Sequence, residues 1–174
     1  MNGLRIRDAR SDDRVAIEAV TLGAYEQYAA VMPALWERYR RNILAALAAA
    51  QPGAQIVAED DGRIVGAVLL YPAGSAMARP GGGSITLKWP EVRLLAVAPQ
   101  ARGRGVGAAL MKECIRRARQ AGALALTLHT TDIMQEAMRL YERLGFRRAP
   151  ELDIEPAPGL TAKGFRLSLE APAS

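Results

Sequence analysis

The sequence predicts one mixed α/β domain spanning residues 1–174, and three observations carry this prediction. The length suits one domain, and half of the 174 residues are apolar, which is enough to bury a core. Two strand-like segments, 55–59 and 63–71, flank a turn and indicate an early hairpin. A strand, a helix and a strand then follow in the middle of the chain, which is the order of an α/β domain.

The N-terminal part alternates extended and helical patterns. Residues 4–7 alternate charged and apolar side chains, as a half-buried strand does. Ser11 is then a candidate N-cap for a helix, and residues 34–50 are expected to form a second helix after the break at Pro33. The Asp-Asp-Gly sequence at 60–62 suits the hairpin turn, because Gly tolerates a positive φ.

The middle of the chain carries the strand–helix–strand succession. Residues 72–83 are rich in Gly, Pro and Ala and are expected to form an exposed, mobile loop. Residues 91–97 are a strand with a polar start and a buried end, 105–120 a helix that Gly122 ends, and 124–129 an alternating strand. The apolar face of the helix consists of Leu110, Met111, Cys114, Ile115 and Ala118.

The last part adds one helix and further strands. Asp132 and Gln135 have the spacing of a capping box, and the helix that they open is closed by Gly145. Strands near 146–149 and 160–169 complete the domain. The apolar face of this helix consists of Ile133, Ala137, Leu140, Tyr141 and Leu144.

Composition excludes several classes of protein. No apolar run approaches the roughly 18 residues that cross a bilayer, and residues 1–10 lack the apolar stretch of a signal peptide. The single cysteine excludes an internal disulfide. We therefore expect a cytoplasmic protein with no membrane partner.

The charge of the chain favours an anionic partner. The formal net charge is +5, and nearly all of the 23 basic residues are arginines. Nucleic acid and a phosphorylated small molecule would both suit this charge. The sequence has no recognised nucleic-acid-binding motif, and aromatic residues make up only 5% of it, so surfaces for stacking bases are scarce. We expect no nucleic acid partner, and most of the arginines to be solvated surface groups.

A glycine-rich loop at 100–107, with the sequence Gln-Ala-Arg-Gly-Arg-Gly-Val-Gly, joins a strand to a helix. A helix N-terminus presents unpaired N–H groups, glycines let an anion approach the backbone, and arginines add charge-assisted hydrogen bonds. The loop therefore predicts an anion cradle. It lacks the Gly-Lys-Ser/Thr ending of a nucleoside-triphosphate loop and the glycine spacing of a dinucleotide fold.

Two motifs together resemble the GNAT superfamily of N-acetyltransferases. The first is R-x-x-G-x-G at 102–107 after a buried strand, and the second is A-x-x-L-Y-E-x-x-G-F at 137–146. They stand at the family's usual separation, and the elements around them follow the family's order over residues 4–169. The resemblance implies a GNAT-type acyl-CoA N-acyltransferase fold with a central, mostly antiparallel sheet of about seven strands flanked by helices.

By this resemblance the chain transfers an acetyl group from acetyl-CoA, its cosubstrate, to an amine of a small molecule or a protein, without a metal. The alternative is a non-catalytic acyl-CoA-binding sensor or regulatory module. The intact glycines and Tyr141 favour the enzyme. The sequence does not identify the acceptor amine or the acyl chain, and a homodimer is a further expectation because many relatives dimerise.

The resemblance also implies the cosubstrate site. Backbone amides at 103–108 would bind the pyrophosphate, and backbone groups at 95–97 would bind the pantetheine arm and the acyl carbonyl. Arg102 stands where glutamine is common in the family, and remains suited to a phosphate. Met134 stands where asparagine is common, so it is left out of the site. The expected cosubstrate-binding residues are Leu95, Ala96, Val97, Arg102, Gly103, Arg104, Gly105, Val106, Gly107 and Ala108.

Glu91 and Tyr141 are the candidate catalytic residues. An amine with a pKa near ~10.4 must lose a proton at neutral pH. Glu91 precedes Ala96 by five residues, the spacing of the catalytic glutamate in some family members, and would act through a water. An ion pair with an arginine across the sheet is an equal alternative for it. Tyr141, a phenol with a pKa near ~10, could protonate a departing thiolate near ~8.5, or it could be a core tyrosine bonded to a backbone carbonyl.

Five other residues have two open interpretations. His129 ends the strand before the last helix, where it could serve the active site or only pack or cap. Four aromatic residues of the first two helices could contact the acceptor, as the family's acceptor contacts do, or hold those helices together. They are Tyr25, Tyr28, Trp36 and Tyr39.

Overall fold

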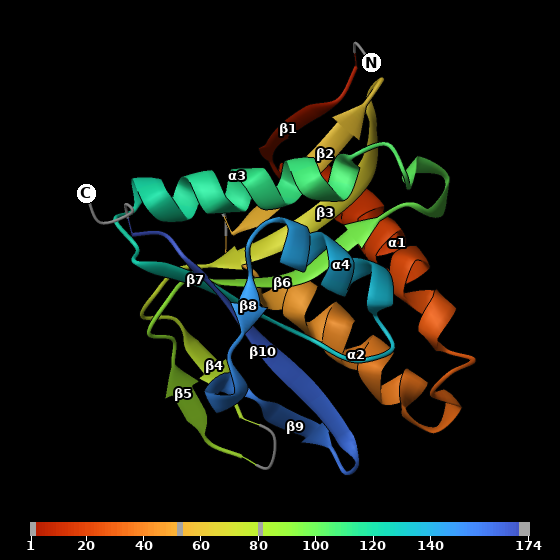
Figure 1. Ribbon diagram of the computed structural model, residues 1–174. Coiled ribbons are helices and arrows are strands. Elements are labelled where there is room, and N and C mark those ends of the chain that lie inside the picture. Colours follow the sequence, from red (N-terminus) through yellow and green to blue (C-terminus); the bar gives the residue numbers. More distant parts are fainter. Residues whose placement is uncertain (1–2, 52–53, 80–81, 171–174) are drawn as a thin grey trace. The chain divides into compact units, whose positions relative to one another are not determined.

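The computed structural model describes residues 3–51, 54–79 and 82–170 (Figure 1). The strands are β1 (Arg5–Asp8), β2 (Gln55–Asp60), β3 (Arg63–Tyr71), β4 (Ala76–Ala78), β5 (Ser84–Thr86), β6 (Glu91–Val97), β7 (Ala125–Thr130), β8 (Arg147–Arg148), β9 (Ile154–Ala157) and β10 (Leu160–Ser168). The α-helices are α1 (Arg14–Tyr25), α2 (Pro33–Ala49), α3 (Val106–Gln120) and α4 (Gln135–Arg143). Short 3-10 turns are η1 (Ser11–Asp13), η2 (Glu26–Tyr28), η3 (Pro99–Ala101) and η4 (Pro150–Leu152).

The central sheet has eight strands in the order β1-β2-β3-β6-β7-β10-β8, with β9 pairing with β10. Its pairings are mostly antiparallel, while β6 and β7 run parallel because α3 connects them. The mixed α/β prediction, with a mostly antiparallel sheet flanked by helices, is confirmed.

Contacts within the chain define two compact units. The first consists of Met1–Leu70 with Leu94–Glu113, and the second of Tyr71–Arg93 with Cys114–Ser174. Strand β6 and helix α3 each contribute to both units. That residues 1–174 act as a single domain stays a prediction.

The first unit contains the predicted hairpin of β2 and β3, beside β1 (Figure 1). Asp61 and Gly62 have φ of 48° and 77° at its turn, and glycine adopts the second value without strain. Helix α3 starts close to β3 because Gly66 has no side chain. A Cβ at Gly66 would lie 2.9 Å from Val106 and 3.0 Å from Leu110.

The start of α1 differs from the prediction. Ser11 does not cap the backbone; its hydroxyl bonds to Asp12, and the residue belongs to η1. Asp13 accepts the backbone N–H of Arg10 at 2.7 Å, and its carboxylate also binds Arg7, which pairs with Glu59 as well. A buried aspartate with an arginine partner thus fixes the helix entry.

In the second unit, β7 and β10 form an antiparallel ladder over residues 125–130 and 163–168. Strand β7 is buried on both faces, so the predicted alternation of buried and exposed side chains along it is wrong. Part of the predicted loop at 72–83 is ordered, because β4 pairs with β5; residues 80 and 81 lie outside the described residues. The buried Cys114 is in the core as predicted.

The predicted capping box of α4 is also wrong. Gln135 donates from its side chain to the backbone carbonyl of Asp132, and the Asp132 carboxylate pairs with Lys163. Helix α4 therefore begins at Gln135 without a side-chain cap. Gly145, with φ of 94°, follows its end as predicted. The segments η4 and β9 were not predicted.

Strand β6 reverses the expected burial. Its polar first residue, Glu91, is 3% exposed, while Leu95 and Val97 near its end are half-buried. Leu94 has φ of 52°, which is unusual for a residue with a side chain and marks a break in the regular strand.

No helix in the described part of the chain is long and apolar enough to cross a membrane. Among the same residues, no group of three or more His, Cys, Asp and Glu side chains could hold a metal ion.

Candidate active site

The predicted anion loop is a glycine turn that leads into α3. Gly103 and Gly105 have φ of 72° and 78°, and a Cβ at either position would meet no atom within 4 Å. Gly105 accepts the first α-helical hydrogen bond of α3, from Ala109 at 3.0 Å. The first amides of α3, at residues 106–108, lie at the positive end of its dipole. Residues 103–105 are exposed at this turn, Val106 is buried, and Gly107 and Ala108 are half-buried.

Both arginines of the loop bind protein groups. The Arg102 guanidinium donates to the Ala24 carbonyl near the end of α1 at 3.4 Å. Arg104 pairs with Asp60 at 2.8 Å. These contacts connect the loop to α1 and to the β2–β3 hairpin. Because both guanidinium groups already have protein partners, backbone amides are the main candidates for binding an anion.

The end of β6 adjoins the aromatic cluster of the first unit. Tyr25 donates its hydroxyl to the Leu95 carbonyl at 3.2 Å. Its ring centroid lies 6.1 Å from that of Tyr28 and 6.0 Å from that of Tyr39, and Trp36 lies 6.4 Å from Tyr39. The four aromatic residues do form one cluster, and one of them binds the backbone of the predicted pantetheine strand.

The second unit holds Glu91 at the start of β6. Thr127 of β7 donates both its backbone N–H, at 3.0 Å, and its hydroxyl, at 3.2 Å, to the Pro90 carbonyl. Glu91 is the register partner of Thr127. These bonds fix the strand start, so that the Glu91 carboxylate is buried beside the next residues of β7.

Two basic side chains approach the same oxygen of Glu91. The Nε of Arg93 lies 2.7 Å from Glu91 Oε1, and Nδ1 of His129 lies 3.5 Å from it. The other ring nitrogen of His129, Nε2, is 2.7 Å from the Leu152 carbonyl of η4. We call Glu91, Arg93 and His129 the acid–base cluster.

The contacts within the acid–base cluster stabilise the charged forms of Glu91 and His129. Burial alone would raise the pKa of Glu91, but the hydrogen bond with His129 and the charge of Arg93 outweigh burial and lower it. Burial alone would lower the pKa of His129, but the hydrogen bond and charge of Glu91 outweigh burial and raise it. Glu91 is therefore a carboxylate at neutral pH, and a weaker base than an isolated glutamate.

Tyr141 and Met134 lie at opposite ends of α4. Tyr141 is buried on the helix, with its ring centroid 6.0 Å from that of Phe146. Met134 precedes the helix and is buried too. The burial of Tyr141 agrees with its predicted apolar face, and both of its proposed roles stay predictions.

Sequence reasoning missed the pairing of Glu91 with His129. One of the two alternatives for Glu91 was an ion pair with an arginine across the sheet, and the arginine found is Arg93 on the same strand. The available signal was the strand–helix–strand unit, because parallel pairing sets the start of β6 beside the second half of β7.

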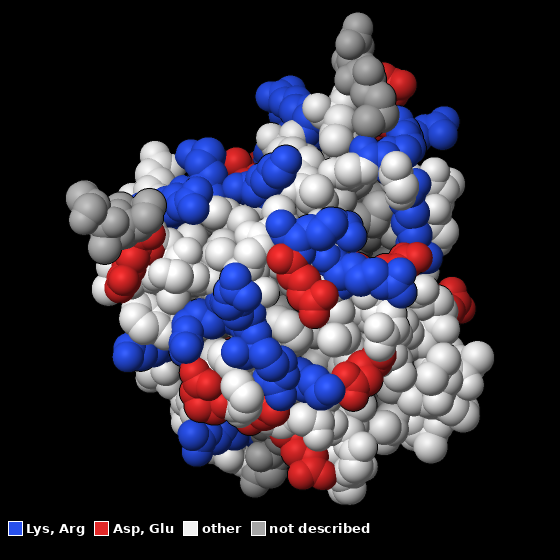
Figure 2. Space-filling model, in the orientation of Figure 1, with Lys and Arg blue, Asp and Glu red and all other residues white. Residues whose placement is uncertain are grey.

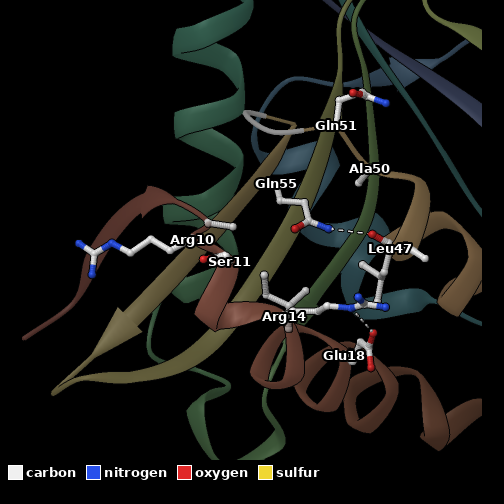
Figure 3. Close-up of a pocket in the computed structure, with 11 residues that line it drawn as sticks. Arg10, Ser11, Arg14, Glu18, Leu47, Ala50, Gln51 and Gln55 are labelled. Atoms are coloured by element: carbon white, nitrogen blue, oxygen red, sulfur yellow. Dashed lines mark hydrogen bonds and ion pairs between the residues drawn. The ribbon is translucent and has the colours of Figure 1, made fainter.

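Two surface features lie outside these groups. A hollow of about 430 Å³ in the first unit is lined by the start of α1, the end of α2 and the start of β2 (Figure 3). There Arg14 pairs with Glu18, and Arg10 points away; no predicted site residue lines it. On the face shown in Figure 2, basic and acidic groups are interspersed. Arg148 and Arg166, for example, pair with acidic side chains.

Comparison with known proteins finds similarity to acetyltransferases. Residues 21–146 match the family described as "Acetyltransferase (GNAT) family". The chain is 30% identical over 117 residues to an uncharacterised N-acetyltransferase of Schizosaccharomyces pombe, covering 67% of this chain and 65% of that protein. It is 31% identical over 105 residues to the L-2,4-diaminobutyric acid acetyltransferase of Nocardia farcinica, covering 60% and 49%. The chain thus spans less than two thirds of the length of these curated relatives.

Solved structures agree on the fold. A GNAT family acetyltransferase from Brucella melitensis, in complex with acetyl-CoA, has a TM-score of 0.60 and 22% sequence identity. The alignment covers 100% of this chain and 93% of that one.

Proposed function

Because the chain belongs to the GNAT family of acetyltransferases, we propose that it transfers an acetyl group from acetyl-CoA to an amine. The observation that carries the proposal is the anion loop of the first unit. Two positive-φ glycines with open space around them, followed by the first amides of α3, would provide the cradle for its pyrophosphate.

The amides of residues 103–108 would hold the pyrophosphate. Arg102 and Arg104 hold the loop against Ala24 and Asp60, and would place positive charge beside it. Backbone groups of residues 95–97 would bind the pantetheine arm and the acyl carbonyl. When bound, acetyl-CoA supplies the activated thioester, and the chain supplies position, charge and proton transfer.

Glu91 is the proposed proton acceptor for the amine, acting through a water. Its lowered pKa keeps the carboxylate ionised, which is the form that a base needs. The same shift makes it a poor base for a free ammonium ion. It would therefore take the proton once the amine attacks the acyl carbon, because the attacking nitrogen then becomes positively charged and far more acidic.

Tyr141 is the proposed proton donor to the departing thiolate. A phenol with an ordinary pKa near ~10 is protonated at neutral pH, and can donate to a thiolate whose conjugate acid has a pKa near ~8.5. Its buried position on α4 would exclude water from its surroundings.

The acceptor is proposed to be an amine that can contact the aromatic cluster of α1, η2 and α2. Aromatic faces attract ammonium groups, and burial raises the pKa of Tyr39, so this phenol stays neutral. The name of the Nocardia relative suggests 2,4-diaminobutyric acid as the first compound to test. A homodimer and a cytoplasmic location, where acetyl-CoA is supplied, are proposed with it.

The test is release of free coenzyme A thiol from acetyl-CoA with a panel of diamines, amino acids, polyamines and peptide N-termini. Amine-dependent release, with an acetylated product of the expected mass, would support the enzyme. Tight binding of acetyl-CoA with no release for any amine would favour the sensor. Failure to bind acetyl-CoA would reject both.

A further inference from the structure

His129 has a hydrogen-bonding partner at one ring nitrogen and an ion-pair partner at the other. Nε2 lies 2.7 Å from the Leu152 carbonyl, which can only accept, so Nε2 carries a proton. Nδ1 lies 3.5 Å from Glu91 Oε1, and an ionised carboxylate also only accepts. A neutral ring protonated at Nε2 would turn a lone pair toward that negative oxygen. The geometry therefore favours an imidazolium with both nitrogens protonated.

The other charged side chains near His129 form ion pairs with partners other than His129. Arg93 binds the same Glu91 oxygen and stacks on Tyr71, with 5.8 Å from its guanidinium carbon to the ring centroid. Near η4 and β10, six further charged side chains form three ion pairs with one another. They are Glu151 with Arg166, Asp153 with Arg148, and Lys163 with Asp132. Glu91 is the one carboxylate among them that lies within 4 Å of the ring.

Gly164 allows η4 to reach His129. It stands opposite His129 in the ladder of β7 and β10. A Cβ at Gly164 would overlap the side chain of Leu152 and lie 2.9 Å from the Ala149 carbonyl. The backbone of Gly164 also bonds to both ends of the turn, since it accepts from Ala149 at 2.9 Å and donates to Asp153 at 2.8 Å. The absence of a side chain thus brings the Leu152 carbonyl within hydrogen-bonding distance of the ring.

We propose that His129 is a positioning residue for the reaction: held between the Leu152 carbonyl and Glu91, it keeps Glu91 ionised and occupies Oε1. The second oxygen, Oε2, is then the one that receives the proton. The inference rests on the proposed role of Glu91 in acetyl transfer. Because the two groups interact closely, the pH dependence of turnover belongs to the pair rather than to either residue.

The first test is an NMR titration of the imidazole C–H signals. The chain has one histidine, so these signals need no assignment by mutation. We expect His129 to titrate above its ordinary pKa of 6.5 in the unmodified protein, and clearly lower in Glu91→Gln. Glu151→Gln is the matched control, since it removes a nearby exposed carboxylate that pairs with Arg166, and should leave the titration unchanged. Equal titration of His129 with and without the Glu91 carboxylate would overturn the proposal.

A second variant tests the route through η4. Gly164→Ala should displace Leu152, weaken its bond to Nε2 and lower the midpoint of the His129 titration. An unchanged midpoint in a folded variant would contradict the role given to Leu152. If Gly164→Ala does not fold, the comparison with Glu91→Gln still decides the pairing.

Kinetics then separate positioning from packing. In His129→Gln the neutral amide can still donate a hydrogen bond, but the positive charge is gone, so protonation of Glu91 becomes easier. The acid limb of kcat/KM should move up by about one pH unit, with KM for acetyl-CoA unchanged. If the acid limb of kcat/KM stays at the same pH and only the melting temperature falls, His129 has a structural role alone. If no amine reacts with the unmodified protein, the proposed function fails while the titration still reports on the pair.

Discussion

The anion loop and the acid–base cluster are built from different kinds of groups. The loop would bind an anion through backbone amides of consecutive residues, at a turn that the positive φ angles of Gly103 and Gly105 shape. The cluster uses three side chains and one carbonyl, taken from β6, β7 and η4. A site built from backbone amides tolerates side-chain substitutions that keep its φ angles. The acid–base cluster, in contrast, should lose its electrostatic balance when any one of its charged side chains is replaced. The two regions should therefore respond to mutation in opposite ways.

The largest effect is expected for Gly105→Glu. A side chain at φ of 78° is strained, and its charge opposes the bound anion, so affinity for coenzyme A should fall by at least about 100-fold. Titration calorimetry measures this directly. Gly122→Glu is the matched control, because Gly122 has φ of 75° and open space around its Cβ but follows the far end of α3. Unchanged affinity in Gly105→Glu would mean that the pyrophosphate binds elsewhere.

Tyr141→Phe should lower turnover on the order of 10²-fold while leaving affinity for acetyl-CoA nearly unchanged, because only the transition state needs the donated proton. Steady-state kinetics with a reactive amine would show the loss. Phenylalanine keeps the ring that packs near Phe146, so the core should stay filled. Normal turnover with reduced thermal stability would instead identify a core tyrosine.

Glu91→Gln should lower kcat/KM about tenfold at neutral pH, and less at high pH, where hydroxide can take the proton from the attacking nitrogen in place of the carboxylate. The measurement is kcat/KM against pH for both proteins. Parallel profiles would reject the proton-acceptor role.

A melting curve at each pH distinguishes the structural part of the same change. The pKa of Glu91 is lowered from 4.5, so its contribution to stability is present above that value and lost at lower pH. The pKa of His129 is raised from 6.5, so its contribution is full below 6.5 and lost as pH rises through the higher folded value. The gap in melting temperature between the two proteins should therefore be widest between about pH 4.5 and 6.5.

The smallest effect is expected for Arg104→Met. Arg104 is half-exposed and bound to Asp60, so its contribution to anion binding is screened by water and salt. Affinity for coenzyme A should weaken about two- to fivefold, and the difference should shrink at high salt. A loss as large as that of Gly105→Glu would show that arginine charge, rather than backbone geometry, dominates the loop.

Much of the fold was predictable because its signals are local. The β2–β3 turn, the helix that follows the glycine loop and the end of α4 at Gly145 each depend on a few neighbouring residues, and all three predictions are confirmed. The wrong predictions concern choices that distant partners decide. Asp13 rather than Ser11 accepts a backbone N–H before α1, that of Arg10, and Arg7, which also pairs with Glu59, holds the Asp13 carboxylate there.

The same division holds for the candidate site. The loop geometry at 103–108 could be read from glycine spacing, since glycine φ angles and helix N-termini are local properties. The acid–base cluster could not be predicted in this way, because it depends on a residue that is distant in the sequence. Gly164, thirty-five residues after His129, lets Leu152 approach the ring but does not itself contact Glu91. The sequence identified Glu91 and His129 as separate candidates, but it did not identify their pairing.

The burial of Cys114 has a practical consequence for the assay. It is the only cysteine of the chain, and it has no solvent-exposed surface. A thiol-reactive dye added to the folded protein should therefore report coenzyme A released by turnover, with little background from the enzyme. If the protein unfolds during the measurement, each chain exposes one thiol, so the background is limited to one equivalent. One reagent can then follow the catalytic product and, in a sample without acetyl-CoA, the integrity of the fold.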